Sequence, residues 1–99
     1  MPRTSRQTAT STTQVDDATV CINHWHFEPG QATGWHRHNY AYAVVPLVDG
    51  TLRIISDDGE VIVPLKAGVC YARPAGVEHD VVNSGAQNMI FIEIEMKKS

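Results

Sequence analysis

From residue 20 onward, turn-forming residues divide the sequence into apolar runs that are too short for anything but β-strands. The turn signals, each containing glycine, are 28–30, 49–50, 57–59, 66–68, 74–76 and 83–85. Between them apolar and polar residues alternate, and no window keeps apolar residues at helical spacing for three turns. Short alternating runs at this spacing are typical of an all-β sandwich or barrel.

This pattern predicts seven strands. They cover residues 20–27, 40–48, 51–56, 60–65, 69–73, 79–83 and 88–96. Asp49-Gly50 has the composition of a two-residue turn, which predicts a hairpin between the second and third of these strands. Pro46 and Pro64 lie inside two of the runs, so each should occupy a sheet edge, a bulge or a strand end, where its missing N–H breaks no ladder.

The chain has 99 residues, which is room for one small domain with one hydrophobic core. Residues 1–14 are nearly all Thr, Ser, Gln, Arg and Ala, a composition with little apolar surface to offset the entropy lost on ordering. We therefore predict a disordered N-terminal tail over residues 1–14 and a folded domain over residues 15–99. The alternative is that this threonine-rich tail adds a strand to a neighbouring subunit.

Charge and hydropathy argue against several classes of partner. The net charge is −3, which gives no electrostatic reason to bind nucleic acid or an anionic membrane. No apolar run approaches the roughly 20 residues of a membrane span, and no apolar segment follows Arg3 and Arg6 as it would in a secretory signal. We expect a cytoplasmic protein in which Cys21 and Cys70, far apart in the sequence, are thiols.

The histidines are the residues best able to carry chemistry. His36 and His38 are two residues apart, so on an extended strand both rings project from one face and can reach one ion. His79 begins a later strand, after the Pro74-x-Gly76 turn. Neutral imidazole is a ligand for Zn, Fe, Ni and Cu, and three ligands leave positions open for water or substrate. Histidine pairs are also common on strand surfaces, so these residues alone leave both interpretations open.

The spacing around the first two histidines resembles the first sequence motif of the cupin family, G-x5-H-x-H-x3–4-E-x6-G. Gly30 is followed by five residues and then by His36-x-His38, and Gly50 stands where the motif ends.

The second cupin motif, G-x5-P-x-G-x2-H-x3-N, is similar at every defined position. The matching residues are Gly68, Pro74, Gly76, His79 and Asn83. This second motif is the more specific of the two, and together they cover most of the predicted domain.

The resemblance implies a fold and a metal site. The fold is all-β, the cupin-type jelly-roll β-barrel that is also called a double-stranded β-helix. The site is one divalent metal ion held by His36, His38 and His79, with Fe, Zn, Ni and Mn left open. The chain further resembles small single-domain cupins, some of which are known as β-alanine degradation proteins.

The glutamate ligand of the first motif is missing. Counting back from Gly50, its position is Ala43, whereas the shorter spacing after His38 gives Tyr42, and neither is a carboxylate. The chain is therefore similar to three-histidine cupins, a class that includes thiol, gentisate-type and diketone dioxygenases. Three neutral ligands leave the full charge on a divalent ion, which favours a small, anionic, chelating substrate.

Other residues are candidates for contacts with that substrate. Trp35 is a candidate aromatic wall beside His36, and Arg73 has a guanidinium that suits a carboxylate. Tyr42 is the third candidate, and the small residues Ala41 and Ala43 on either side of it are predicted to open space beside the metal.

Three further polar residues are not expected to bind the metal ion. His24 and His26 share a strand face whose opposite face carries Trp25 and Phe27, so these histidines are predicted to face solvent or a partner subunit. Glu93 is interpreted as a solvated strand residue, with a hydrogen bond to a ligand histidine as the alternative.

Two classes of function fit these features. One is a metal-dependent enzyme, of dioxygenase type, that acts on a small anionic metabolite. The other is a non-catalytic module that binds or senses such a molecule through the metal, and a barrel with a degenerate site would give the same sequence. A modest core and strands that are apolar on both faces, as around Ile90-Ile92-Ile94, predict a homodimer.

Overall fold

A computed structural model describes residues 7–97 of the chain. These residues form nine strands: β1 Thr10–Asp16, β2 Val20–Phe27, β3 His36–Arg37, β4 Ala41–Pro46, β5 Gly50–Ser56, β6 Gly59–Leu65, β7 Tyr71–Arg73, β8 Glu78–Asn83 and β9 Met89–Met96. All seven predicted strands are confirmed, with ends that differ by at most two residues. Within this described part there is no helix, and hence none long and apolar enough to cross a membrane.

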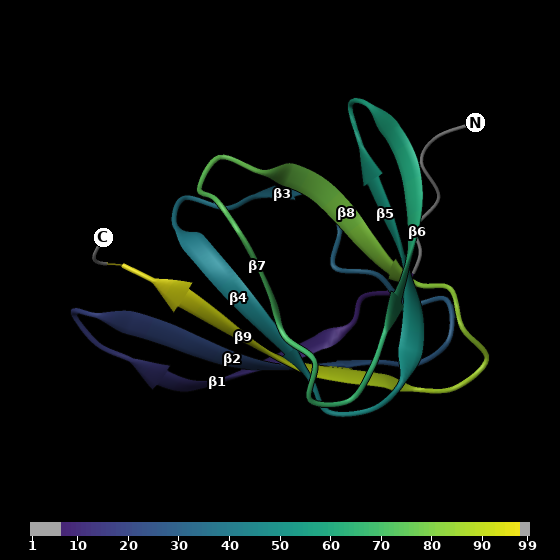
Figure 1. Cartoon of the computed structure of the whole chain (residues 1–99), viewed down its shortest axis with the longest axis horizontal. Coiled ribbons are helices and arrows are strands. Elements are labelled where there is room, and N and C mark those ends of the chain that lie inside the picture. The colour runs from purple at the N-terminus through teal and green to yellow at the C-terminus, as the bar shows by residue number, and fades with distance from the viewer. Residues whose placement is uncertain (1–6, 98–99) are drawn as a thin grey trace.

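The strands form two antiparallel sheets (Figure 1). The larger sheet has the order β1-β2-β9-β4-β7, and the smaller has the order β3-β8-β5-β6. Figure 1 shows the larger sheet along the lower left and the smaller one along the upper right. The strands form two open sheets rather than one continuous closed barrel. The two prolines lie at positions of the predicted kind: Pro46 ends β4, and Pro64 lies in the edge strand β6.

The hydrophobic core lies between the two sheets. Phe27 and Met89 from the larger sheet and Leu52 from the smaller sheet are completely buried. The Phe27 ring lies 5.8 Å from the Trp25 ring and 5.4 Å from the Phe91 ring, measured between centroids. Because side chains alternate along a strand, this packing makes the odd-numbered residues of β2 and β9 face inward.

The first strand differs from the prediction of a disordered tail. Thr10–Asp16 pairs with β2 of the same chain, and Ala9 just before it is buried in the core. All seven side chains of β1 are exposed, so the backbone ladder holds this strand rather than apolar burial. Composition indicates how much apolar surface a segment can bury but not whether its backbone can pair with another strand, so it did not predict β1. Residues 1–6 of the predicted tail lie outside the described residues.

The predicted hairpin at Asp49-Gly50 is wrong, because this segment carries the chain from one sheet to the other. β4 before it pairs with β9 and β7, whereas β5 after it pairs with β6 and β8. A Cβ at position 50 would lie 2.5 Å from the sulfur of Met89, so any residue other than glycine there would force this buried side chain to shift. Asp49 anchors the crossing by accepting a 2.9 Å hydrogen bond from the backbone N–H of Ala67.

A buried asparagine ties the turn after β8 to β2. The side-chain amide of Asn83 donates to the carbonyl oxygens of Phe27 at 3.2 Å and Gln87 at 2.8 Å. Its oxygen accepts from the backbone N–H of Gly85 at 3.0 Å. Asn83, the last position of the second motif, therefore has a structural role: its hydrogen bonds tie the turn after β8 to β2.

Replacing Asn83 by alanine should lower the free energy of unfolding by about 2–3 kcal/mol, because it leaves buried backbone groups without partners. Urea unfolding measures this change. Asn88→Ala, at an exposed position, is the control and should stay within about 0.5 kcal/mol of the wild type. Equal unfolding midpoints for the two variants would show that the three hydrogen bonds add no net stability.

Candidate metal centre

Strand pairing brings the three predicted histidines together. His36 lies in β3, His38 follows directly, and His79 lies in β8 opposite His36. The turn before β8 holds His38 from both sides: the His38 N–H donates to the carbonyl of Val77, and the Gly76 N–H donates to the carbonyl of His38, each at 2.8 Å. Gly76 has a φ of 96°, a conformation that side chains disfavour, which explains the glycine in this turn.

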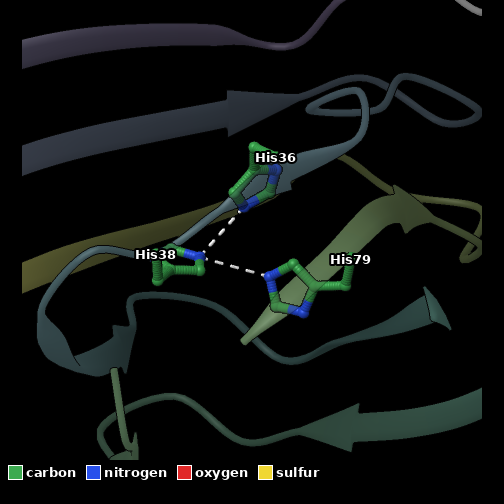
Figure 2. Close-up of side chains that lie close together, drawn as sticks. All are labelled: His36, His38 and His79. Carbon is green, nitrogen blue, oxygen red and sulfur yellow. Dashed lines mark hydrogen bonds between the residues drawn. The ribbon is translucent and has the colours of Figure 1, made fainter. Parts of the chain in front are cut away.

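The ring nitrogens of the three histidines converge (Figure 2). The Nε2 atom of His38 lies 2.9 Å from that of His36 and 3.2 Å from that of His79. Nitrogens about 2.1 Å from an ion are about 3.0 Å apart at a 90° angle and about 3.4 Å apart at a tetrahedral angle. Both spacings therefore suit neighbouring positions around one ion. Among the residues that the structure describes, no carboxylate joins the three as a fourth ligand.

Hydrogen bonds determine which nitrogen of His36 carries the proton. Its Nδ1 atom lies 2.8 Å from the carbonyl oxygen of Gly34, which can only accept, and 3.2 Å from the hydroxyl of Thr33. Nδ1 is therefore the donor, and Nε2 turns a lone pair toward the cluster. His38 has two ring-nitrogen neighbours and at most one Nε2 proton, so hydrogen bonds alone cannot satisfy all three nitrogens. A cation shared by the three nitrogens would satisfy all of them.

Burial keeps two of the rings uncharged. Desolvation, followed by the nearby His36 and His79 rings, lowers the pKa of His38 to about 4. Desolvation, followed by His36 and the charge of Arg73, lowers the pKa of His79 to about 4. Both rings are therefore neutral at physiological pH and keep the lone pairs that a metal ion requires.

Tyr42 occupies the inward position where the first motif usually has glutamate. It is buried, and its ring stacks on His38 with 3.8 Å between centroids and 17° between planes. Ala43 lies on the opposite face of β4, so counting back from Gly50 selects the wrong residue. For the same reason Ala41 and Ala43 do not open space beside the histidines, and that prediction is wrong.

The other two substrate-binding candidates lie outside the histidine cavity. Trp35 is 40% exposed and lines a separate groove with Asp57 and Glu78, so it is not a wall of this site. Arg73 is exposed, and its guanidinium carbon lies 4.9 Å from the centroid of the Tyr71 ring. Its charge still reaches the site, because after burial and His36 it contributes to the lowered pKa of His79.

Sequence reasoning did not place two further residues, Glu93 and Trp25, in the lining of the cavity. Glu93 is only 8% exposed, against the interpretation of a solvated side chain, and it lines the histidine cavity with Trp25. The available signal was strand alternation: Glu93 shares a face of β9 with Phe91, so a buried Phe91 implies a buried Glu93. No hydrogen bond joins Glu93 to a histidine within the described residues; its carboxylate accepts from the Asn23 side chain at 3.3 Å.

The cavity bounded by these residues is small. Its volume is about 20 Å³, room for an ion or a water molecule. His38 and His79 are buried, whereas His36 is only half-buried, so the His36 side is the more open to solvent.

Comparison with known proteins gives close matches over nearly the whole chain. Residues 23–95 match the family described as the cupin domain. A protein of Pseudomonas aeruginosa named beta-alanine degradation protein BauB is 49% identical over 92 residues, which cover 93% of this chain and 97% of that protein.

Solved structures agree with this match. The crystal structure of a cupin domain from Bordetella pertussis has a TM-score of 0.92 and 43% sequence identity, over 96% of this chain and 99% of that one. A protein of Klebsiella pneumoniae with a double-stranded β-helix domain has a TM-score of 0.76 at 23% identity, over 96% of this chain and 82% of that one, and shows the fold alone.

The lowered histidine pKa values predict that acid destabilises the metal-free protein. Unfolded histidine takes up a proton near pH 6.5, whereas folded His38 and His79 do so only near pH 4. Between these values the unfolded state binds more protons, so the free energy of unfolding should fall as the pH drops from about 6.5 to about 4.

Urea unfolding in chelator at several pH values measures this decline. The double variant His38→Gln/His79→Gln has no imidazole at either position and should show a shallower decline. Parallel curves for the two proteins would contradict the assignment of buried neutral rings.

Proposed function

The chain belongs to the cupin family, and on that premise we propose that it binds one divalent metal ion through His36, His38 and His79 and acts through this ion on a small anionic metabolite. The observation that carries the proposal is the convergence of three ring nitrogens on one buried point. An all-imidazole set with its lone pairs free suits iron, zinc or nickel, so the residues present fit such an ion.

The ligand set also supports an acid as substrate. Three neutral rings cancel none of the charge of a divalent ion, and Tyr42 stands where a carboxylate would have done so. A buried setting strengthens the attraction of that charge for an anionic oxygen. The name of the Pseudomonas aeruginosa relative refers to β-alanine degradation, which supports a small carboxylic acid as the substrate class here.

Within this class we favour an enzyme of dioxygenase type over a binding module. Three histidine ligands would leave positions open for an acid and for oxygen, and iron(II), when bound, would activate oxygen while the acid supplies the electrons for dioxygenation. The chain's own contribution is to keep His38 and His79 unprotonated, to orient His36 through Gly34, and to cover one side of His38 with the Tyr42 ring.

We expect His36→Ala, His38→Ala and His79→Ala each to lose most of the bound metal, because each removes one of three ligands. His24→Ala and His26→Ala, on the outward face of β2, are matched controls and should keep wild-type metal content. Elemental analysis of the purified variants measures this. The melting temperature of the wild type should fall on chelation, since the ion stabilises only the folded state. Equal metal in all five variants would refute the ligand set.

The iron-loaded wild type and the His79→Ala variant also test the activity. With small carboxylic acids added, oxygen consumption that needs both the acid and the intact site supports the enzyme. Metal-dependent binding without oxygen consumption would assign the chain to the binding class instead.

We also propose that the chain forms a homodimer through the outer face of the larger sheet. There Ile22 of β2 lies opposite Ile94 of β9, and Ile92 of β9 lies opposite Val45 of β4. These four side chains are half-buried, although the described residues place no further layer over them. A second copy offers the same row of uncharged side chains, which makes the surface self-complementary.

The dimer predicts that Ile92→Lys shifts the protein toward a monomer, because the new charge would be buried in the interface. Ile62→Lys is the control, since Ile62 is 58% exposed on the edge strand β6 of the other sheet. Sedimentation or light scattering measures the mass. A monomeric wild type would refute the dimer, and dissociation by Ile62→Lys alone would move the interface to β6.

A further inference from the structure

We propose that the Glu93 carboxylate forms a second binding point in the histidine cavity, which takes an ammonium or hydroxyl group on the same small acid whose own carboxylate reaches the metal ion. This inference rests on the proposed function and narrows its substrate class to short amino acids and hydroxy acids.

The first support is position. His36 and His79 belong to β3 and β8 of the smaller sheet, whereas Trp25 and Glu93 belong to β2 and β9 of the larger sheet. All four line one cavity, so metal-ligating groups and the Glu93 carboxyl meet it from different sheets. A ligand held by the histidine side therefore presents its remaining atoms to the sheet that carries Glu93.

The second support is that the Glu93 carboxylate on this wall has few partners. The buried Trp25 indole N–H lies near it but meets hydrogen-bonding geometry with none of the described residues. Glu93 has the single bond from Asn23, at 3.3 Å, and no ion pair among the residues described. Buried carboxylates are nearly always well hydrogen-bonded or paired, so a carboxylate with one long hydrogen bond at a cavity wall fits a ligand that donates to it.

The third support is charge. Burial raises the pKa of the Glu93 carboxyl, and the neighbouring Glu95 adds to this, while the Asn23 and Trp25 side chains act in the opposite direction. The indole N–H thus lies near enough to favour the carboxylate although it is outside hydrogen-bonding geometry. An ammonium group would supply the cation that this carboxylate lacks, and a hydroxyl would supply a donor.

The geometry separates this role from metal ligation. The ligand atoms of the three histidines lie within 4.8 Å of one another, and no oxygen of Glu93 belongs to that group. The enclosed volume of about 20 Å³ holds only an ion or one water molecule, so the remaining atoms of an acid must enter from the more open His36 side. A carboxylate and a donor group separated by a short chain keep the ligand small enough to reach from the ion to Glu93.

The test compares three acids that share a three-carbon chain: propionate, 3-hydroxypropionate and β-alanine. The protein is loaded with zinc, which prevents redox turnover, and binding is measured by calorimetry. The wild type should bind β-alanine and 3-hydroxypropionate at least tenfold more tightly than propionate. Glu93→Gln should reduce the preference for β-alanine at least tenfold while zinc content and propionate affinity stay at wild-type values.

Matched variants separate this role from a general effect on the fold. Glu60→Gln, at an exposed position of β6 outside the cavity lining, should leave all three affinities unchanged. Trp25→Phe keeps an aromatic ring and removes the N–H that favours the Glu93 carboxylate, so it should reduce the preference for β-alanine without loss of zinc.

The outcomes distinguish this inference from the proposed function. Acid binding that needs zinc but has the same ligand preference in the wild type and Glu93→Gln would overturn the inference and leave the proposed function standing. Loss of zinc in Glu93→Gln would make Glu93 a metal ligand and also overturn it. Absence of acid binding to the zinc-loaded wild type would overturn both.

Discussion

The pairing of β3 with β8 is the contact on which the histidine cluster depends. β3 has only two residues and cannot persist alone, so it is defined by its partner strand and by the turn that bonds to His38 from both sides. Gly76 makes that turn possible because its backbone adopts a positive φ. A small number of backbone hydrogen bonds thus sets the relative positions of three rings that lie up to 43 residues apart in the sequence.

The cavity concentrates polar groups in an otherwise apolar core, and this has an electrostatic cost. His38 and His79 remain neutral, the Glu93 carboxyl has a raised pKa, and the Trp25 N–H has no hydrogen-bond partner among residues 7–97. Such an arrangement is unfavourable in an empty core and favourable around a cation and a polar ligand. The same interpretation accounts for the close approach of the histidine nitrogens, which hydrogen bonds alone cannot satisfy.

The two faces of the larger sheet have different roles. On β9, Glu93 faces the cavity whereas Ile92 and Ile94 face outward, and on β2 Trp25 and Ile22 divide in the same way. The outer row that we assign to a dimer therefore lies directly behind the wall that we assign to the ligand. Burial of the outer row would order the same strands that hold Glu93 and Trp25.

Local pattern was sufficient to predict the seven longer strands, the two prolines at permissive positions and the three histidines, because alternation, turns and motif spacing are written in consecutive residues. The sequence alone did not determine which face of each strand is inside or which strand is its partner. Tyr42 rather than Ala43 faces the histidines, Glu93 is buried, Asp49-Gly50 crosses between sheets, and Thr10–Asp16 finds a free edge on β2. Each depends on pairing with residues far away in the chain, and a shift of one residue would have reversed every face. The sequence thus determined the strands and the histidines that lie together, and the tertiary structure decided what surrounds them.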